Sequence, residues 1–270
     1  MTNYKKKCNQ EYEFIVLGDP HIDSDYCDIK LFKKHLNYAL KNNIDVYCIG
    51  DLLDVMQGRN DPRRNNKQDK DKYYNWIIDY AVSILEPYKD IIKFISYGNH
   101  ETSVMKNNDL DLLQIIVNRL NDKGGKITLG SYSGWWQFKL FHGTANYVYK
   151  VKYIHGFGGG GNRTKGVIQY TDVLVSCGDV DMVIMGHTHD QTEVTFEKEY
   201  INTQGNIKYK SVQCSRVASY KNESEKGMGW HVERGAPPKP RGSKHYTIKY
   251  DKNHGIDYQV KLLGAILWIT

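Results

Sequence analysis

Three segments of the sequence follow one pattern: a short apolar run rich in β-forming residues ends in glycine, and a polar, ligand-capable residue follows at once. They are EFIVLG before Asp19, IDVYCIG before Asp51, and IIKFISYG before Asn99. Apolar runs of this length are typical of strands buried on both faces. Helical stretches at about 28–42 and 70–86 separate the runs, which predicts parallel strands joined by helices. The polar residues then lie at the carboxyl ends of neighbouring strands, where open α/β sheets bind ligands.

The second half of the sequence has a different pattern, with many strand-like runs and one helix. We predict a helix near 165–177 and strands at about 135–142, 147–154, 181–186, 192–200, 207–215 and 244–262. Strand-rich sequence after βαβ units predicts two sheets packed together. A length of 270 residues is compatible with one large domain.

Composition indicates a soluble globular chain with a small basic surplus. Lys and Arg outnumber Asp and Glu by 37 to 31, a surplus that suits an anionic substrate without requiring one. The five cysteines form no CxxC pair, which favours a reducing, cytoplasmic location over a disulfide framework. The N-terminal stretch lacks the apolar region of a signal peptide, and the apolar C-terminal stretch is too short to cross a bilayer. We therefore expect no membrane association.

Five short motifs follow the predicted strands in chain order: D-P-H at 19–21, G-D-L-L-D at 50–54, G-N-H-E at 98–101, H-G at 155–156 and G-H-T-H at 186–189. Each motif alone is weak, because a single buried histidine is more often a hydrogen-bonded core residue than a ligand. Carboxylate, imidazole and amide oxygen are ligands for divalent ions of hard to borderline character. Two such ions about 3.5–4 Å apart can clamp an in-line phosphoryl displacement. The set therefore predicts a metal-dependent phosphoesterase with two divalent metal ions.

Taken together, the five motifs resemble the signature of the calcineurin-like metallophosphoesterase superfamily, and the resemblance covers residues 19–189. It implies an α/β fold, a two-sheet αββα sandwich of mixed β-sheets flanked by helices. It also implies one metallophosphoesterase domain over residues 1–270, with C-terminal strands and a basic loop at about 233–270. We expect Mn²⁺ in the site, with Fe, Zn, Ni and Co as alternatives.

Carried over position by position, the resemblance also implies a role for each site residue. The first metal would be held by Asp19, His21, Asp51 and His189, and the second by Asn99, His155 and His187, with Asp51 bridging the two. His100 would stand beside the metals, donate a hydrogen bond to the phosphate and protonate the leaving oxygen. Asp54 would orient His100, and the alternative role for Asp54 is a helix N-cap.

The isolated His-Gly motif has two candidates, because His142-Gly143 also follows a strand-like run. We favour His155, since the residues before it alternate more like a core strand. The glycines at 158–161 would also let the backbone approach a metal or phosphate closely.

The glycine-rich loop from Gly156 to Lys165 leads into the predicted helix. Its backbone N–H groups could cradle a phosphate, with Arg163 or Lys165 adding positive charge as substrate-binding residues. The alternative is an ordinary flexible surface loop.

Three functions remain open. The first is a phosphodiesterase or nuclease acting on DNA, RNA or nucleotides, suggested by basic loops at 59–72 and 233–245 and by aromatic residues that could stack on bases, namely Trp135, Trp136, Tyr147, Tyr149, Phe157 and Trp230. The second is a phosphomonoesterase or protein Ser/Thr phosphatase. Protein phosphatases place Arg-Gly directly after G-D-x-x-D, whereas Val55-Met56 follows here. The third is a catalytically silent scaffold, which the complete ligand set disfavours.

Overall fold

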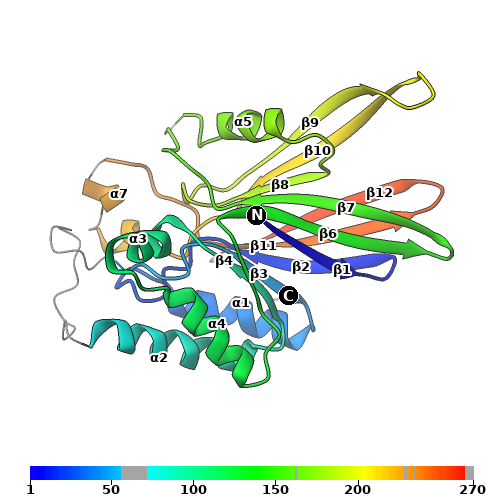
Figure 1. The fold of residues 1–270 in the computed structure, drawn as a ribbon. Coiled ribbons are helices and arrows are strands. Elements are labelled where there is room, and N and C mark those ends of the chain that lie inside the picture. Colours follow the sequence, from blue (N-terminus) through cyan, green and yellow to red (C-terminus); the bar gives the residue numbers. More distant parts are fainter. Residues whose placement is uncertain (56–71, 162, 228–229, 234, 265–270) are drawn as a thin grey trace.

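Two six-stranded sheets pack face to face, and helices cover both outer faces (Figure 1). The computed structural model describes residues 1–55, 72–161, 163–227, 230–233 and 235–264. The predicted basic loop at 59–72 therefore lies outside the described residues except for its last position. The predicted two-sheet sandwich of mixed sheets flanked by helices is confirmed.

The first sheet has the strand order β12-β11-β2-β3-β4-β5. Its strands are β2 (Glu11–Leu17), β3 (Asp45–Ile49), β4 (Ile92–Ser96), β5 (Thr128–Gly130), β11 (Gly242–Asp251) and β12 (Gly255–Gly264). Strands β2 to β5 are parallel, as the βαβ pattern predicts, and β11 pairs antiparallel with β2 and with β12. The outer helices, which lie below this sheet in Figure 1, are α1 (Ile29–Lys41), α2 (Tyr73–Leu85) and α4 (Leu112–Asp122). A single turn of 3₁₀-helix, η1 (Glu86–Tyr88), follows α2.

The second sheet has the order β1-β6-β7-β8-β10-β9, with α5 (Ile168–Ser176) on its outer face (Figure 1). Its strands are β1 (Thr2–Lys7), β6 (Ser133–His142), β7 (Ala145–Ile154), β8 (Met182–Met185), β9 (Thr192–Ile201) and β10 (Ile207–Arg216). Two short helices, α6 (Glu223–Lys226) and α7 (Trp230–Glu233), follow β10 and precede β11 in the sequence. Inward-facing aromatic residues fill the space between the sheets, with Phe14 and Tyr47 from the first packing on Trp136 and Phe138 from the second.

Some elements differ from the expectation. The predicted run at 244–262 is a hairpin of two strands, β11 and β12, because the turn at residues 252–254 reverses the chain. Helices α3 (Asn99–Asn108) and α4 and the edge strands β1 and β5 were not predicted. Within the described part of the chain, no helix is both long and apolar enough to cross a membrane.

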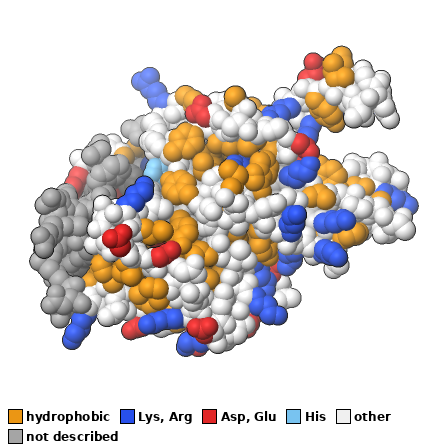
Figure 2. All heavy atoms as spheres, in the orientation of Figure 1, with side chains coloured by type: hydrophobic (Ala, Val, Ile, Leu, Met, Phe, Trp, Pro, Cys, Tyr) orange, Lys and Arg blue, Asp and Glu red, His pale blue; other side chains and the backbone are white. Residues whose placement is uncertain are grey.

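Charged side chains show no single basic stripe on the face seen in Figure 2. Lys and Arg side chains are scattered there, and they are denser over the strands on the right than beside the grey segment on the left.

Candidate metal centre

The predicted ligands come together in the loops that follow five strands, drawn from both sheets. Strands β2, β3 and β4 of the first sheet lead to Asp19, Asp51 and Asn99. In the second sheet, β7 leads to His155 and β8 to His187. Backbone hydrogen bonds hold these loops against one another, since His21 N donates to Asp51 O at 3.0 Å and Gly186 N donates to His155 O at 2.8 Å.

Five of the seven predicted ligands have left-handed backbone conformations. Their φ angles are +46° at Asp19, +47° at His21, +46° at Asp51, +71° at His187 and +58° at His189. Such angles are uncommon outside glycine and cost on the order of 1 kcal/mol or more each. Strain of this kind concentrated in one cluster is typical of a functional site, where the fold holds side chains in positions that local preference would not choose.

Glycines before the ligands make room for ligands from other strands. A Cβ atom on Gly98 would lie 2.0 Å from Asp51 Oδ1, and one on Gly50 would lie 2.5 Å from His155 Nδ1. The Gly-ligand pattern in the sequence therefore has a steric cause: no larger residue fits where the loops cross.

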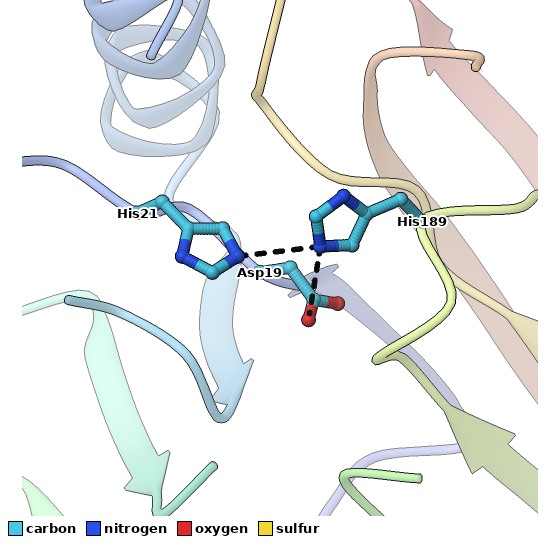
Figure 3. A group of neighbouring side chains, drawn as sticks. All are labelled: Asp19, His21 and His189. Carbon is cyan, nitrogen blue, oxygen red and sulfur yellow. Dashed lines mark hydrogen bonds and ion pairs between the residues drawn. The ribbon is translucent and has the colours of Figure 1, made fainter. Parts of the chain in front are cut away.

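The first group of ligands consists of Asp19, His21 and His189, whose donor atoms converge (Figure 3). His21 Nε2 lies 3.3 Å from His189 Nε2, and His189 Nε2 lies 3.7 Å from Asp19 Oδ1. Donor atoms that share an ion at 2.0–2.2 Å are separated by distances of this order. All three side chains are buried. These residues therefore fit a divalent ion.

The second group consists of Asp51, His155 and His187, with Asn99 between the two imidazoles. Asn99 Oδ1 lies 3.0 Å from His155 Nε2 and 2.8 Å from His187 Nδ1. Asp51 Oδ2 lies 3.2 Å from His155 Nε2 and 3.9 Å from His21 Nε2, so this one oxygen faces both groups.

Hydrogen bonds to backbone carbonyls fix the proton positions of two imidazoles. His155 Nδ1 donates to Ile49 O at 2.9 Å, and His187 Nε2 donates to Gly158 O at 2.9 Å. A carbonyl oxygen only accepts, so in each neutral ring the other nitrogen carries a lone pair. His155 Nε2 and His187 Nδ1 both face the Asn99 oxygen, and His155 also faces the Asp51 carboxylate. Atoms gathered in this way need a positive charge between them, which a proton on His155 Nε2 supplies in the metal-free protein and a second metal ion would supply when bound.

Charges within the cluster shift the pKa values of the ligands in the metal-free protein. Burial raises the pKa of Asp19 to about 7, although the charge of His155 acts in the opposite direction. Burial acts to lower the pKa of His155, but Asp51 outweighs it and raises this pKa to about 10. Burial likewise acts to raise the pKa of Asp51, yet His155 and His100 hold it well below its ordinary value. Metal binding at neutral pH therefore displaces a proton from the cluster.

His100 lies in the first turn of α3, beside both groups. Its Nδ1 donates to the backbone oxygen of Asp54 at 2.5 Å, and its Nε2 lies 3.6 Å from Asp51 Oδ2. Burial acts to lower the pKa of His100, but Asp51 and Asp54 together raise it. The ring is therefore held with a proton facing the metal ligands.

Asp54 lies closer to His21 than to His100, its predicted partner. Its Oδ1 lies 3.0 Å from His21 Nδ1 and 3.8 Å from His100 Nδ1. The carboxylate thus orients His21, a predicted metal ligand, while the backbone of Asp54 orients His100. The alternative role as a helix N-cap involves residues after Val55, which lie outside the described residues.

The two candidates for the isolated histidine lie at opposite ends of a β-hairpin. His142 ends β6 and pairs in register with Ala145, whereas His155 follows the far end of β7. Ten residues of strand separate them, which is about 30 Å. His142 Nδ1 lies 3.3 Å from Asp251 Oδ2, and His155 lies in the ligand cluster.

The predicted substrate-binding residues Arg163 and Lys165 are exposed in the turn before α5. Helix α5 starts at Ile168, so the loop does not open directly into it. Among the described residues, no hydrogen bond or ion pair joins either side chain to the metal ligands.

Three residues of the site were missed by the sequence analysis, the buried Glu101 and Arg216 and the partly buried Lys221. Glu101 accepts hydrogen bonds from the backbone N–H groups of Gly98, Asp51 and Leu53 at 2.9, 3.2 and 2.9 Å, which locks the β3 and β4 loops together. Its position three residues after Gly98 is the capping-box spacing, a signal that could have indicated this role. Lys221 Nζ lies 2.7 Å from Asp54 Oδ1. Arg216 is buried at the end of β10 beside the loop that carries His187.

Comparisons with known proteins give only distant likenesses. No family model matches the chain, and no curated protein matches its sequence. Among solved structures, it is similar to GAP50, titled the anchor in the inner membrane complex of Plasmodium, at 13% identity over 94% of this chain and 85% of that chain, with a TM-score of 0.44. It is also similar to Vps29 from Chaetomium thermophilum, at 14% identity over 93% of this chain and 96% of that chain, with a TM-score of 0.35. A metallophosphoesterase from Sphaerobacter thermophilus is 11% identical over 93% of this chain and 88% of that chain, with a TM-score of 0.38. At these identities and scores, the neighbours carry no information on the function of this chain.

Proposed function

We propose that the protein is a dinuclear-metal-dependent phosphoesterase that hydrolyses phosphodiester bonds in nucleic acid or nucleotides. The observation that carries the proposal is the placement of Asp51, whose single oxygen faces a group of ligands on each side. A bridging carboxylate between two sets of nitrogen and oxygen ligands suits a pair of divalent ions. Carboxylate, imidazole and amide donors without thiolate favour Mn²⁺ and related metals.

The residues around the ions have separate tasks in this proposal. When bound, the ions supply Lewis-acid charge that neutralises phosphate oxygens and makes water a stronger nucleophile at neutral pH. His100 binds the phosphate through Nε2–H and gives that proton to the departing alcohol oxygen, since Nδ1 is held by Asp54 O. The raised pKa of His100 supports the protonated form that a general acid needs.

A pocket beside His189 is the best candidate for the rest of the substrate. It is lined by His189, Lys221, Lys239 and Arg241 together with Asn222, Glu223, Ser224, Glu225 and Pro238. Each of its three cations is anchored by a carboxylate at 2.7 Å, Lys221 by Asp54, Lys239 by Asp190 and Arg241 by Asp28. Glu223 and Glu225 make the charge of the pocket mixed, and its fixed polar side chains offer hydrogen bonds to an ester group that extends beyond the scissile phosphate, as a diester does.

The aromatic residues support nucleic-acid binding less than expected. Trp136 and Tyr149 are buried between the sheets, so they cannot stack on a base. Tyr147 donates a hydrogen bond to Asp181, and Trp135 packs on the core cluster under α5. Phe157, which is 38% exposed two residues after His155, is left as the aromatic side chain that could contact a base near the site. The side chain of Trp230 lies outside the described part of the chain.

An activity panel tests the proposal. Protein reconstituted with Mn²⁺ is assayed on bis-p-nitrophenyl phosphate, p-nitrophenyl phosphate, cyclic nucleotides, single-stranded DNA and RNA. We expect hydrolysis of the diesters, with His100→Ala lowering kcat roughly 10²–10⁴-fold while both metals stay bound. Hydrolysis confined to the monoester would overturn diester specificity in favour of a phosphomonoesterase. Bound metal without turnover on any substrate would favour the scaffold.

A further inference from the structure

Arg216 is a fully buried guanidinium that donates hydrogen bonds in two directions. On one side, Nη1 donates to Gly186 O at 2.8 Å and to Thr188 Oγ1 at 2.9 Å, the residues on either side of His187. On the other side, Nη2 donates to Gly166 O at 3.0 Å and to Gln169 Oε1 at 2.7 Å, at the start of α5. One planar side chain therefore joins the loop after β8 to the loop before α5.

Gln169 extends this connection to the glycine-rich loop. Its Nε2 donates to Phe157 O at 2.6 Å, and the next carbonyl, Gly158 O, accepts the hydrogen bond from His187 Nε2 at 2.9 Å. The contacts form a chain that starts at Gly186 and Thr188, on either side of His187, and ends at the imidazole of His187 itself. We call Arg216 and Gln169 the clasp.

The electrostatics of Arg216 are unusual for a buried charge. All four of its short oxygen acceptors are neutral, and among the described residues no carboxylate oxygen lies within 4.0 Å of it. The guanidinium carbon lies 5.6 Å from the centre of the Tyr170 ring. Burial of a cation without a carboxylate partner is costly, and the four hydrogen bonds from Nη1 and Nη2 to oxygen offset that cost, while Nε has no hydrogen-bond partner among the described residues. A lysine cannot reproduce them, because its ammonium lacks the planar fork that reaches both loops.

The backbone around the clasp is shaped to fit it. A Cβ atom on Gly166 would lie 2.9 Å from the guanidinium carbon, and Gly166 itself has a φ angle of +73°. His187 also has a left-handed backbone and would not hold its conformation by local preference. The ring of His187 therefore depends on contacts from outside its own loop.

We propose that the clasp positions His187, and thereby sets the affinity for the second metal ion, the one assigned to Asp51, Asn99, His155 and His187. Arg216 binds Gly186 O and the Thr188 hydroxyl on either side of His187. Gln169 binds Phe157 O, the carbonyl next to the Gly158 oxygen that accepts from the far nitrogen of the His187 ring. Without either contact, the His187 ring can rotate. Its proton is then no longer held on Nε2, the tautomer in which Nδ1 can bind the metal. Outer contacts of this kind typically change metal affinity 10–100-fold. The inference rests on the dinuclear site of the proposed function.

Two substitutions test the clasp. Gln169→Glu keeps the volume and the acceptor for Arg216 but loses the donor to Phe157 O, and Arg216→Lys keeps the charge but loses the fork. Gln213→Glu is the matched control, because Gln213 lies on the same strand, β10, and accepts from Thr195 Oγ1 on the sheet surface. Mn²⁺ binding is measured by isothermal titration calorimetry, and the coupled pair of ions by electron paramagnetic resonance.

For Gln169→Glu and Arg216→Lys we expect the first Mn²⁺ ion to bind with wild-type affinity and the second to bind at least tenfold more weakly. The paramagnetic resonance signal of the coupled ion pair should be weaker as well. Gln213→Glu should match the wild type. Two ions bound with wild-type affinity by both folded clasp variants would overturn the inference. If Arg216→Lys fails to fold by circular dichroism, Gln169→Glu decides, since it removes one hydrogen-bond donor without changing volume. A wild-type protein that binds fewer than two ions would instead contradict the proposed function.

Discussion

At the scale of single residues, the roles divide between atoms that face the cluster and atoms that hold them in place. His155 illustrates both, because Nδ1 donates to Ile49 O while Nε2 faces Asp51 and Asn99. Removal of the His155 side chain should therefore abolish the binding of one ion and leave the far ends of the strands unchanged.

We predict that His155→Ala lowers bound Mn²⁺ from two ions to one per chain. His142→Ala is the matched control, since it removes the same side chain about 30 Å away at the other end of the hairpin. Metal analysis after dialysis measures both. Retention of two ions by His155→Ala, with loss of one by His142→Ala, would reverse the assignment.

The carboxylate of Asp54 faces both His21 and His100, and a substitution can test which of the two it orients. Because its carboxylate is closer to His21 than to His100, Asp54→Asn should weaken the first ion roughly 10–100-fold, measured by titration calorimetry. If instead both ions bind normally and the alkaline limb of the pH profile of kcat moves, the carboxylate acts through His100, because a general acid loses its proton on that limb.

The ligand residues could be predicted from the sequence because each follows an apolar strand and a glycine. The residues that support them could not. Arg216 and Lys221 belong to no motif, and their partners lie more than 25 positions away in the chain. Strand β10 also carries Lys208, Lys210 and Gln213, so one more charged residue at its end gave no signal for Arg216.

At the scale of elements, the loops after β3 and β4 cross so closely that steric contacts exclude any larger residue at their glycine positions. Gly98 has φ −110° and ψ −174°, a conformation open to any residue, so substitution there tests space alone. We predict that Gly98→Ala abolishes metal binding, because the new Cβ would lie 2.0 Å from Asp51 Oδ1. Gly159→Ala, with no atom within 4 Å of its Cβ, should bind two ions normally. Equal metal content in the two variants would show that the loops are not held as described.

Helix α1 makes a pH-sensitive contact with the segment after β10 and with the start of β11. His35 is buried, its Nδ1 lies 2.8 Å from Tyr220 Oη and 3.1 Å from Ser243 Oγ, and burial lowers its pKa to about 4. The unfolded chain takes up a proton near pH 6.5, and the folded chain does so only near pH 4. Stability should therefore fall as the pH drops through this window, by roughly 3 kcal/mol for this group.

The measurement is urea unfolding at intervals from pH 7 to pH 4, for the wild type and His35→Gln. The variant should show a shallower loss of stability on acidification, because it lacks the titrating ring. Parallel curves for the two proteins would exclude His35 as a source of the pH dependence.

Some elements have a sequence pattern that predicts them, and others do not. Strands β2, β3 and β4 are continuous apolar runs and were predicted. Helix α3 was not, because Glu101 and Val104 are its only buried residues among ten, so it has no apolar stripe. The edge strand β1 has one apolar side chain, Tyr4, and ends in three consecutive lysines, which are typical of edge strands and give no alternating apolar pattern.

At the scale of the whole molecule, the candidate centre joins the two sheets. Asp19, Asp51 and Asn99 follow strands of the first sheet, whereas His155 and His187 follow strands of the second. An ion shared by both sets would resist their separation during unfolding. The sandwich itself was predictable from the pattern of runs, but the meeting of the two ligand sets across it depends on the pairing order of the strands.

We therefore predict that Mn²⁺ raises the unfolding temperature. At a free concentration 100-fold above the dissociation constant, one ion adds about 2.7 kcal/mol, or roughly 5–10 °C for a chain of this size. Calorimetry with Mn²⁺ and with EDTA measures the shift. Asp51→Asn, which removes the shared charge, should show little of it, and an equal shift in that variant would place the ions elsewhere.

The most direct test of the central claim counts ions and turnover together. Metal-free protein receives Mn²⁺ in steps, and bound ions per chain and hydrolysis of bis-p-nitrophenyl phosphate are recorded at each step. The account predicts two ions per chain, with hydrolysis rising as the second binds. Hydrolysis by metal-free protein, full activity with one ion, or two bound ions without hydrolysis would contradict it.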